Sequence, residues 1–275
     1  MALSQQSPPI DEREDRPDNL HEAMDVYFTA KARMFAGISS FALRRVGPLA
    51  CFHNHPGWPE VDGFYAVDGE TATDEVVSAV RAYQPTMEHM ITIFTASPQS
   101  LVPPYAERGY EALPDPQPFM SKRLTNPIAP VSAPASPVSI EDAPDVSRVE
   151  TKAQFDFLNS YKPEPVMEPE HLNDPLYRYY YIEHDNKPVC WGRCIMAMPE
   201  AIYVAGMETL PDYRRRGLAT ALMNRIHADA ERSGAKQSIL CSTVLGFGLY
   251  SKVGYHTVRY MQAFVPQVSP NRNLY

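Results

Sequence analysis

The apolar positions in the second half of the chain predict an alternating series of strands and helices. A nearly continuous apolar run over 201–210 predicts a buried strand. Apolar residues spaced three and four apart over 218–233 predict an amphipathic helix, which Gly234 is expected to end. Short apolar runs over 236–243 and 257–265 predict two further strands. The order is therefore strand, helix and strand, followed by a closing strand near the end of the chain.

The segment before this series predicts a helix, a loop and a hairpin. Spacing of apolar residues over 151–161 indicates a helix. Proline- and acid-rich residues over 163–175 indicate a loop region, which we expect to arch over a substrate cleft. Partly alternating runs over 177–184 and 188–196 flank Asp185-Asn186-Lys187 and predict a β-hairpin.

The first half of the chain repeats this order of elements. The expected elements are strands over 63–67, 89–96 and 119–124 and a helix over 74–83. The run from Pro104 to Glu111 also matches the run from Leu249 to His256, because in both a tyrosine is followed four residues later by Gly-Tyr. We interpret the agreement as an internal repeat. Chance similarity between two short runs is the alternative.

An arginine-rich turn within residues 210–220 is the strongest candidate for chemistry. Three consecutive arginines directly precede Gly217, and the predicted amphipathic helix follows. The first four N–H groups of a helix have no acceptor within it, and the helix dipole makes that end positive. The small residues Gly217 and Ala219 would let a pyrophosphate approach the backbone closely, and Thr220 can add a hydroxyl donor. The turn therefore predicts a polyphosphate site, with a solvated basic turn as the alternative.

The turn resembles motif A of the GNAT superfamily, the acyl-CoA-dependent N-acyltransferases. The family pattern Arg/Gln-x-x-Gly-x-Gly/Ala is met by Arg214, Gly217 and Ala219. The run from Gly248 to Tyr255 resembles the second signature of the family, Leu-Tyr-x-x-x-Gly-Phe/Tyr. Order and spacing agree over about residues 137–266. The resemblance implies an α/β (α+β) fold, in which a mixed, mostly antiparallel twisted sheet is flanked by helices.

The resemblance also implies acetyl-CoA as the cofactor. Backbone N–H groups of the turn would hold the coenzyme A pyrophosphate, and the strand ending at Leu210 would pair with the pantetheine arm as an extra strand. The chain departs from the family at Thr243, where Asn is frequent, and at Gly246, where a small Ala is usual. The residues implied to bind the cofactor are Met207, Thr209, Leu210, Arg214, Arg215, Arg216, Gly217, Leu218, Ala219, Thr220, Thr243 and Gly246.

Two residues are expected to take part in proton transfer. Tyr250 matches the family tyrosine that lies near the thioester sulfur, where a phenol can protonate the departing thiolate. The alternative for Tyr250 is a helix tyrosine packed in the core. Glu208 is the leading candidate for the base, because the resemblance places its strand beside the thioester. A Glu inside an apolar strand is also costly to bury without a partner. Glu208 could instead point to solvent or pair with an arginine of the turn. Other candidate bases are His184, Glu183, Glu164, Glu168 and Glu170.

The first half lacks the arginine pattern. At the corresponding position it has the acidic segment Asp68 to Asp74, which would repel a pyrophosphate. We therefore expect a tandem arrangement with a degenerate GNAT-like domain over 18–124 that binds no coenzyme A and helps to shape the substrate cleft. Tyr105 is then expected to be a core residue. Residues 1–17 are interpreted as a disordered tail, 125–137 as a proline- and alanine-rich linker, and 138–268 as the catalytic domain.

Composition narrows the function further. The net charge of −8 does not suggest nucleic-acid binding. The chain has no apolar stretch of membrane-spanning length, and its N-terminus lacks a signal core. Scattered cysteines predict free thiols and a cytoplasmic location. His53 and His55 alternate and could face a metal, but no nearby residues complete a ligand set, so we expect no metal.

The sequence therefore predicts an N-acetyltransferase. It would move an acetyl (acyl) group from acetyl-CoA to a primary amine of a small molecule by direct attack in a ternary complex, and would act as a monomer or homodimer. The alternatives are a non-catalytic acyl-CoA sensor, a GNAT-fold decarboxylase or thioesterase, and a protein N-acetyltransferase.

Overall fold

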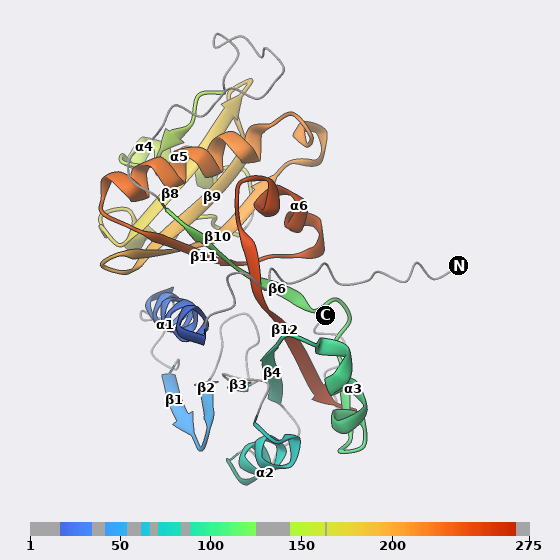
Figure 1. Ribbon diagram of the computed structural model, residues 1–275. Coiled ribbons are helices and arrows are strands. Elements are labelled where there is room, and N and C mark those ends of the chain that lie inside the picture. The colour runs from blue at the N-terminus through green and yellow to red at the C-terminus, as the bar shows by residue number, and fades with distance from the viewer. Residues whose placement is uncertain are drawn as a thin grey trace. The chain divides into compact units, whose positions relative to one another are not determined.

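The computed structural model shown in Figure 1 describes residues 17–34, 42–53, 62–66, 71–83, 89–124, 144–162 and 164–267. The chain divides into two compact units. The first contains residues up to Met120, residues 241–247 and residues from His256 onward, and the second contains Ser121–Leu240 and Gly248–Tyr255. Each unit therefore takes residues from both halves of the sequence. The predicted tail, up to residue 16, and the predicted linker over 125–137 lie outside the described residues.

The sheet of the second unit is mixed and mostly antiparallel, as predicted. Its strands run in the order β11-β10-β9-β8-β7. Strands β7 to β10 pair antiparallel, and β11 runs parallel to β10. The strands are β7 Ser147–Arg148, β8 Tyr177–His184, β9 Lys187–Met198, β10 Ala201–Thr209 and β11 Gln237–Cys241. The predicted hairpin is β8–β9, turned by Asp185 and Asn186 at φ values of 51° and 57°.

Helix α5 (Leu218–Arg232) covers one face of this sheet, and Figure 1 shows it lying across β8 and β9. The predicted amphipathic spacing is confirmed, because Leu222, Ile226 and Ala230 are fully buried. Gly234, at φ 89°, follows the end of the helix as expected. The other helical segments are α4 Lys152–Asn159, α6 Val244–Lys252 and the short 3₁₀ turns Pro169–His171 and Pro211–Tyr213.

A buried carboxylate ties α5 to its neighbours. Asp229 is buried, and its side chain accepts hydrogen bonds from Tyr180 Oη at 3.1 Å and from Arg225 Nε at 3.0 Å. Arg232 also pairs with it. A buried charge is tolerated only when it is paired and hydrogen-bonded. Arg225, which is four residues before Asp229 on the same helix face, therefore helps to compensate the buried charge of Asp229.

A buried histidine makes the stability of the second unit sensitive to acid. His227 Nε2 lies 2.9 Å from Tyr255 Oη, and Nδ1 lies 3.2 Å from Lys122 Nζ. Burial, and then the charge of Lys122, lowers the pKa of His227 to about 3. The pKa in the unfolded chain is higher, at about 6.5, so acid protonates the unfolded chain first and shifts the equilibrium toward it.

We expect the free energy of unfolding to fall by about 2 kcal/mol through His227 alone between pH 7 and pH 5. The contribution is fully present above pH 6.5 and is lost as the pH falls toward 3. The His227→Gln variant, which keeps hydrogen-bonding atoms but does not titrate, should lose much of this slope. Urea unfolding at both pH values measures it. An equal pH dependence in variant and wild type would contradict the assignment.

The first unit pairs strands in the order β1-β2-β3-β4-β12. Strands β3 and β4 are parallel and joined through α2, which matches the predicted strand–helix–strand order. The strands are β1 Ala42–Val46, β2 Leu49–His53, β3 Asp62–Ala66, β4 His89–Thr95, β5 Tyr110–Ala112 and β12 His256–Pro266. Strand β6 (Gln117–Arg123) begins in this unit, and its residues from Ser121 onward belong to the second unit.

The helices of this unit are α1 Pro17–Met34, α2 Thr73–Tyr83 and α3 Pro98–Ala106. The sequence patterns did not predict α1. Its apolar residues, among them Met24 and Tyr27, are nevertheless buried, and Tyr27 packs edge-on against Phe94 and Phe119 at 5.9 Å. At the place where the second unit has its arginine turn, the first turn of α2 contains Asp74, which pairs with Arg108 at 2.6 Å.

The last strand joins the first unit. The sequence predicted it to close the series of the second half, but β12 pairs antiparallel with β4 and β5. Phe264 of β12 stacks on Tyr105 at 4.1 Å, and both side chains are buried, so the core position predicted for Tyr105 is confirmed. An alternating apolar pattern specifies that a strand forms, whereas its partner depends on contacts between distant parts of the chain.

The two tyrosine runs have the same local structure. In each, a helix ends before a glycine with positive φ, which is 79° at Gly109 and 92° at Gly254. Each glycine N–H donates to the carbonyl three residues earlier. The tyrosine that follows each glycine, Tyr110 or Tyr255, is buried. The internal repeat therefore holds at the level of local geometry.

Candidate functional site

The arginine turn joins β10 to α5 and exposes its backbone. After the 3₁₀ turn, Arg215 and Gly217 take left-handed conformations at φ 63° and 82°. Residues 214–217 are exposed, and Leu218 begins α5 with Gly217 as its N-cap. Glycine adopts this conformation at little cost, whereas a side chain would be strained there. The glycine at this position therefore lets the chain pass from the exposed turn into α5.

Several backbone N–H groups at this turn have no backbone acceptor among the described residues. The first backbone bond that reaches back to the turn is donated by Ala221 to the carbonyl of Gly217. Within the described part of the chain, no backbone hydrogen bond is donated by residues 215–220. No side chain caps the helix either. This row of donors lies at the positive end of α5, an arrangement that favours an anion.

Two arginine side chains of the turn donate hydrogen bonds to backbone carbonyl oxygens just before it. Arg214 Nε donates to the carbonyl oxygen of Thr209 at 3.0 Å. The Arg216 guanidinium donates to the carbonyl oxygen of Asp212 at 2.7 Å and lies 5.2 Å from the centroid of the Tyr213 ring. The turn is therefore braced by its own side chains, and its positive charge stays at the surface.

Strand β10 has an open edge and a bulge just before the turn. Within the described chain, β11 pairs with β10 at Ala201, Ile202 and Tyr203 and no farther along. On the other side, the register with β9 shifts between Ala205 and Glu208, where Gly206 takes φ 63°. A bulge of this kind redirects the side chains that follow it. The open edge exposes backbone groups that an extended ligand can pair with.

The bulge sends Met207 and Glu208 to opposite faces of the sheet. Met207 faces α5. A Cβ added to Gly192 on the neighbouring strand would lie against both Met207 Sδ and Leu222 of that helix, so the two side chains are on the same side of the sheet. Glu208 pairs across the strands with Trp191, and paired residues share a face. Thr209 donates a hydrogen bond to Cys190 Sγ at 3.1 Å. Glu208 therefore lies on the face away from α5.

Glu208 forms an ion pair on this face. Lys162 Nζ lies 2.5 Å from Glu208 Oε2 and 5.2 Å from the centroid of the Trp191 ring. The Tyr161 ring lies 5.9 Å from that of Trp191. Glu208 therefore has Lys162 as its ion-pair partner and not an arginine of the turn, and its side chain is 39% exposed to solvent. The side chain is partly buried and its partner comes from the segment after α4.

A second polar cluster on the same face was not found from the sequence. His171 Nδ1 lies 2.9 Å from Tyr179 Oη, and Arg193 donates to the same oxygen at 3.2 Å. Arg193 and Tyr179 pair across β8 and β9, two residues from Trp191 along β9. Burial, and then the charge of Arg193, lowers the pKa of His171, which favours its neutral form. The acid-rich composition of 163–175 drew attention to its carboxylates, and His171 was overlooked.

The other candidate bases lie apart from the bulge. His184 and Glu183 are at the exposed end of β8, where the His184 ring lies 5.3 Å from that of Tyr213. His184 also pairs with Asp185 at 3.0 Å. The carboxylates of the preceding loop are exposed, namely Glu164, Glu168 and Glu170.

Tyr250 is the buried residue of α6. It is 8% exposed, and its ring meets that of Tyr255 edge-on at 6.0 Å. Thr243 caps the start of the same helix, because its hydroxyl and carbonyl oxygens accept hydrogen bonds from Gly246 N at 3.2 Å and 3.1 Å. Gly246 is partly buried. Thr243 therefore has a structural role at the start of α6.

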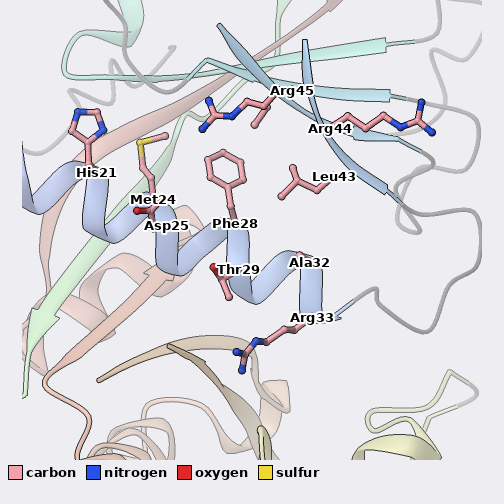
Figure 2. Close-up of a pocket in the computed structure, with 11 residues that line it drawn as sticks. His21, Met24, Asp25, Phe28, Thr29, Ala32, Arg33, Leu43, Arg44 and Arg45 are labelled. Atoms are coloured by element: carbon pink, nitrogen blue, oxygen red, sulfur yellow. The ribbon is translucent and has the colours of Figure 1, made fainter. Parts of the chain in front are cut away.

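The first unit contains a separate hollow of about 700 Å³ between α1 and the β1–β2 hairpin. Figure 2 shows Met24 and Phe28 rising from α1, with Leu43 and Arg45 on the strand side. Its lining combines apolar side chains with exposed arginines, and its acidic residue is the exposed Asp25. The hollow has neither a helix start with unpaired N–H groups nor a bulged strand, so it does not resemble the turn in the second unit.

The described residues show neither a metal-ligand cluster nor a membrane-spanning helix. No group of three or more potential metal ligands gathers there. The side chain of His53 and all of His55 lie outside the described residues. No described helix is both long and apolar enough to cross a bilayer. The four cysteines, Cys51, Cys190, Cys194 and Cys241, form no disulfide within the described residues.

Comparison with known proteins gives the family. The sequence matches the description "Acetyltransferase (GNAT) family" over residues 146–255. No curated protein matches the sequence. A GCN5-related N-acetyltransferase from Kribbella flavida has a similar fold, with a TM-score of 0.60 and 14% identity over 91% of this chain and 98% of that one.

Two further solved structures have the same fold over most of their length. A GCN5-related N-acetyltransferase from Sphaerobacter thermophilus gives a TM-score of 0.53 at 13% identity, covering 88% of this chain and 90% of that one. A tandem GNAT protein from the clavulanic acid biosynthesis pathway gives 0.52 at 11% identity, covering 94% and 97%. The predicted mixed α/β fold is thereby confirmed, and residues 146–255 of this chain are a domain of the GNAT acetyltransferase family.

Proposed function

We propose that the protein transfers an acetyl group from acetyl-CoA to a primary amine of a small molecule. The observation that carries the proposal is the exposed turn at 215–220, whose backbone N–H groups have no backbone acceptor in the described chain. The open edge of β10 runs directly into this turn. A cofactor with a pyrophosphate at one end and an amide-containing arm at the other fits both features.

In this proposal the turn residues bind the pyrophosphate and β10 binds the pantetheine arm. Gly217 and Ala219 leave the backbone accessible, and the helix dipole of α5 favours the negative charge. Backbone groups of Met207, Thr209 and Leu210 pair with the amides of the arm. Bound acetyl-CoA supplies a thioester, whose carbonyl carbon accepts an amine. The contributions of Thr243 and Gly246 stay predictions from the family resemblance.

Two side chains are proposed to move protons. Tyr250 donates its phenol proton to the departing thiolate, which leaves as the thiol, and its burial excludes competing water. Glu208 accepts a proton from the incoming ammonium, directly or through a water molecule. Its position beside the β10 bulge, on the face away from α5, supports this role. His171 is a second candidate base, because the lowering of its pKa favours the neutral imidazole.

Direct attack by the amine is favoured over a cysteine-bound intermediate. Cys190 lies beside Thr209 and is the described thiol next to the end of β10. Burial raises its pKa to about 11, so little thiolate is present near neutral pH. The acetyl group is therefore proposed to move in one step within a ternary complex.

Thiol release from acetyl-CoA in the presence of a panel of primary amines tests the function. Amine-dependent release with a matching mass increase of the amine supports it. Release without any amine would instead indicate hydrolysis, and turnover of malonyl-CoA without an amine would indicate decarboxylation. Tight binding of acetyl-CoA without release would indicate a sensor.

Replacing Glu208 with glutamine is expected to lower kcat about 100-fold, because the proton acceptor is removed while size and hydrogen bonding are kept. Binding of coenzyme A should not change. Steady-state kinetics at saturating acetyl-CoA measures the effect. Glu164→Gln, which neutralises an exposed carboxylate of the preceding loop, is the matched control and should retain activity. An unaltered kcat in Glu208→Gln would transfer the role of base to another group, with His171→Gln as the next variant to measure.

A further inference from the structure

Lys162 places its ammonium group in a site made by two other residues. Its Nζ contacts the Glu208 carboxylate at 2.5 Å and lies 5.2 Å from the centre of the Trp191 ring. The lysine and glutamate side chains are 34% and 39% exposed, whereas Trp191 is buried. The carboxylate and the ring are therefore fixed parts of the sheet, and the lysine approaches them from a neighbouring segment.

The carboxylate and the ring form a receptor for a cation. Glu208 and Trp191 are paired across β10 and β9 and share one face. A carboxylate accepts a charge-assisted hydrogen bond from an ammonium group, and the face of an indole attracts the same cation. Tyr161 adds an aromatic wall beside Trp191 at 5.9 Å. Because Lys162 is held at both the carboxylate and the ring, the site accommodates an ammonium on an unbranched alkyl chain.

We propose that Glu208 and Trp191 form the subsite for the acceptor ammonium, that the preferred acceptors are unbranched primary alkylamines, and that Lys162 occupies this subsite until an acceptor displaces it. This inference rests on the proposed acetyl transfer. A partly exposed ion pair adds little to stability, so the lysine can leave at low cost. While it stays, it competes with the acceptor and weakens its apparent affinity.

The Lys162→Met variant isolates this competition. Methionine keeps an unbranched chain of similar length but carries no charge. The matched control is Lys187→Met, because Lys187 Nζ lies 4.9 Å from the centre of the Tyr161 ring on the same aromatic wall. Both variants remove one positive charge from this region, but only the first empties the Glu208 site.

Binding is measured without acetyl-CoA, by following the Trp191 indole N–H signal in NMR titrations at pH 7. The ligand is protonated 1-aminopentane, and the controls are 1-pentanol and aniline, which are uncharged at this pH. We expect Lys162→Met to bind 1-aminopentane about 10-fold more tightly than wild type does. This factor corresponds to a wild-type subsite in which Lys162 occupies about nine-tenths of the molecules and leaves about one-tenth open to the ligand. Lys187→Met should match wild type, and adding Glu208→Gln to Lys162→Met should remove the gain.

Two results would overturn the inference. One is equal affinity in Lys162→Met and wild type, and the other is an equal gain in both lysine variants. Thermal unfolding of Lys162→Met and of a second variant, Lys162→Gln, tests whether Lys162 only holds its segment in place. In that case both variants would lose stability and neither would bind 1-aminopentane more tightly. If other amines are acetylated but Lys162→Met gives no gain, the inference fails and the acetyltransferase function stands. If the gain appears and no amine is acetylated, the cation site stands and the function fails.

Discussion

Replacing Gly217 with glutamate is expected to weaken coenzyme A binding at least about 100-fold. The change puts a negative charge beside the N–H groups of residues 215–220, which have no backbone acceptor in the described chain. A carboxylate within a few ångströms of a pyrophosphate repels it strongly where solvent screening is reduced. The side chain would also strain the turn, because Gly217 has φ 82°. Isothermal titration calorimetry with coenzyme A measures the loss.

The same helix supplies a matched control. Gly234 follows the other end of α5 at φ 89°, and a Cβ at Gly217 or at Gly234 would meet nothing within 4 Å. Gly234→Glu therefore carries a similar backbone cost, about 1 kcal/mol or more, with the same added charge. It should lower stability slightly and leave coenzyme A binding intact. Equal binding by the two variants would show that the turn is not the pyrophosphate site.

Tyr250→Phe is expected to lower kcat by about 10²- to 10⁴-fold while coenzyme A still binds. The substitution removes only the phenol oxygen, so the leaving thiol loses its proton donor and the packing of the ring is kept. Tyr250 is the buried residue of α6, so another donor or bulk water cannot readily replace it. Single-turnover measurements with saturating acetyl-CoA isolate the chemical step from product release.

Tyr255→Phe is the control for this prediction. Its hydroxyl lies 2.5 Å from Ser238 Oγ and 2.9 Å from His227 Nε2, and burial raises the pKa of the phenol. Removing it leaves buried partners unsatisfied, which costs about 1–3 kcal/mol of stability. The reaction rate of the folded variant should stay close to that of wild type. If Tyr250→Phe behaves in the same way, Tyr250 is a packing residue and the thiol receives its proton elsewhere.

The two tyrosine runs have similar local geometry but different surroundings. Tyr105 stacks on Phe264 and is 1% exposed, so its phenol serves the core of the first unit. The first turn of α2, which corresponds to the arginine turn, contains Asp74, whose pKa is lowered by its hydrogen bond from Arg108. A helix start whose acid is paired in this way offers no positive site for a phosphate. The buried Tyr105 and the paired Asp74 are consistent with our proposal that the first unit has a structural role and binds no coenzyme A.

Local features of this protein were determined by the sequence itself. The hairpin turn at Asp185 and Asn186, the helix start at Gly217 and the amphipathic face of α5 depend on residues close together in the chain. Their conformations follow from steric preferences and from the 3.6-residue period. The arginine pattern and the Tyr250 run are equally local, and they led to the correct family for residues 146–255.

The tertiary structure decided which distant segments meet. Strand β12 was expected to close the second half, but it pairs with β4 and β5 of the first unit. Glu208 was expected to be the base, with solvent or an arginine of the turn as the alternative surroundings, and its ion pair with Lys162, which follows α4, was not foreseen. His171 was overlooked because its cluster with Tyr179 and Arg193 exists only once η2, β8 and β9 are packed. A residue pattern determines the conformation of its own segment, whereas strand pairing and charge pairing depend on the packing of the whole chain.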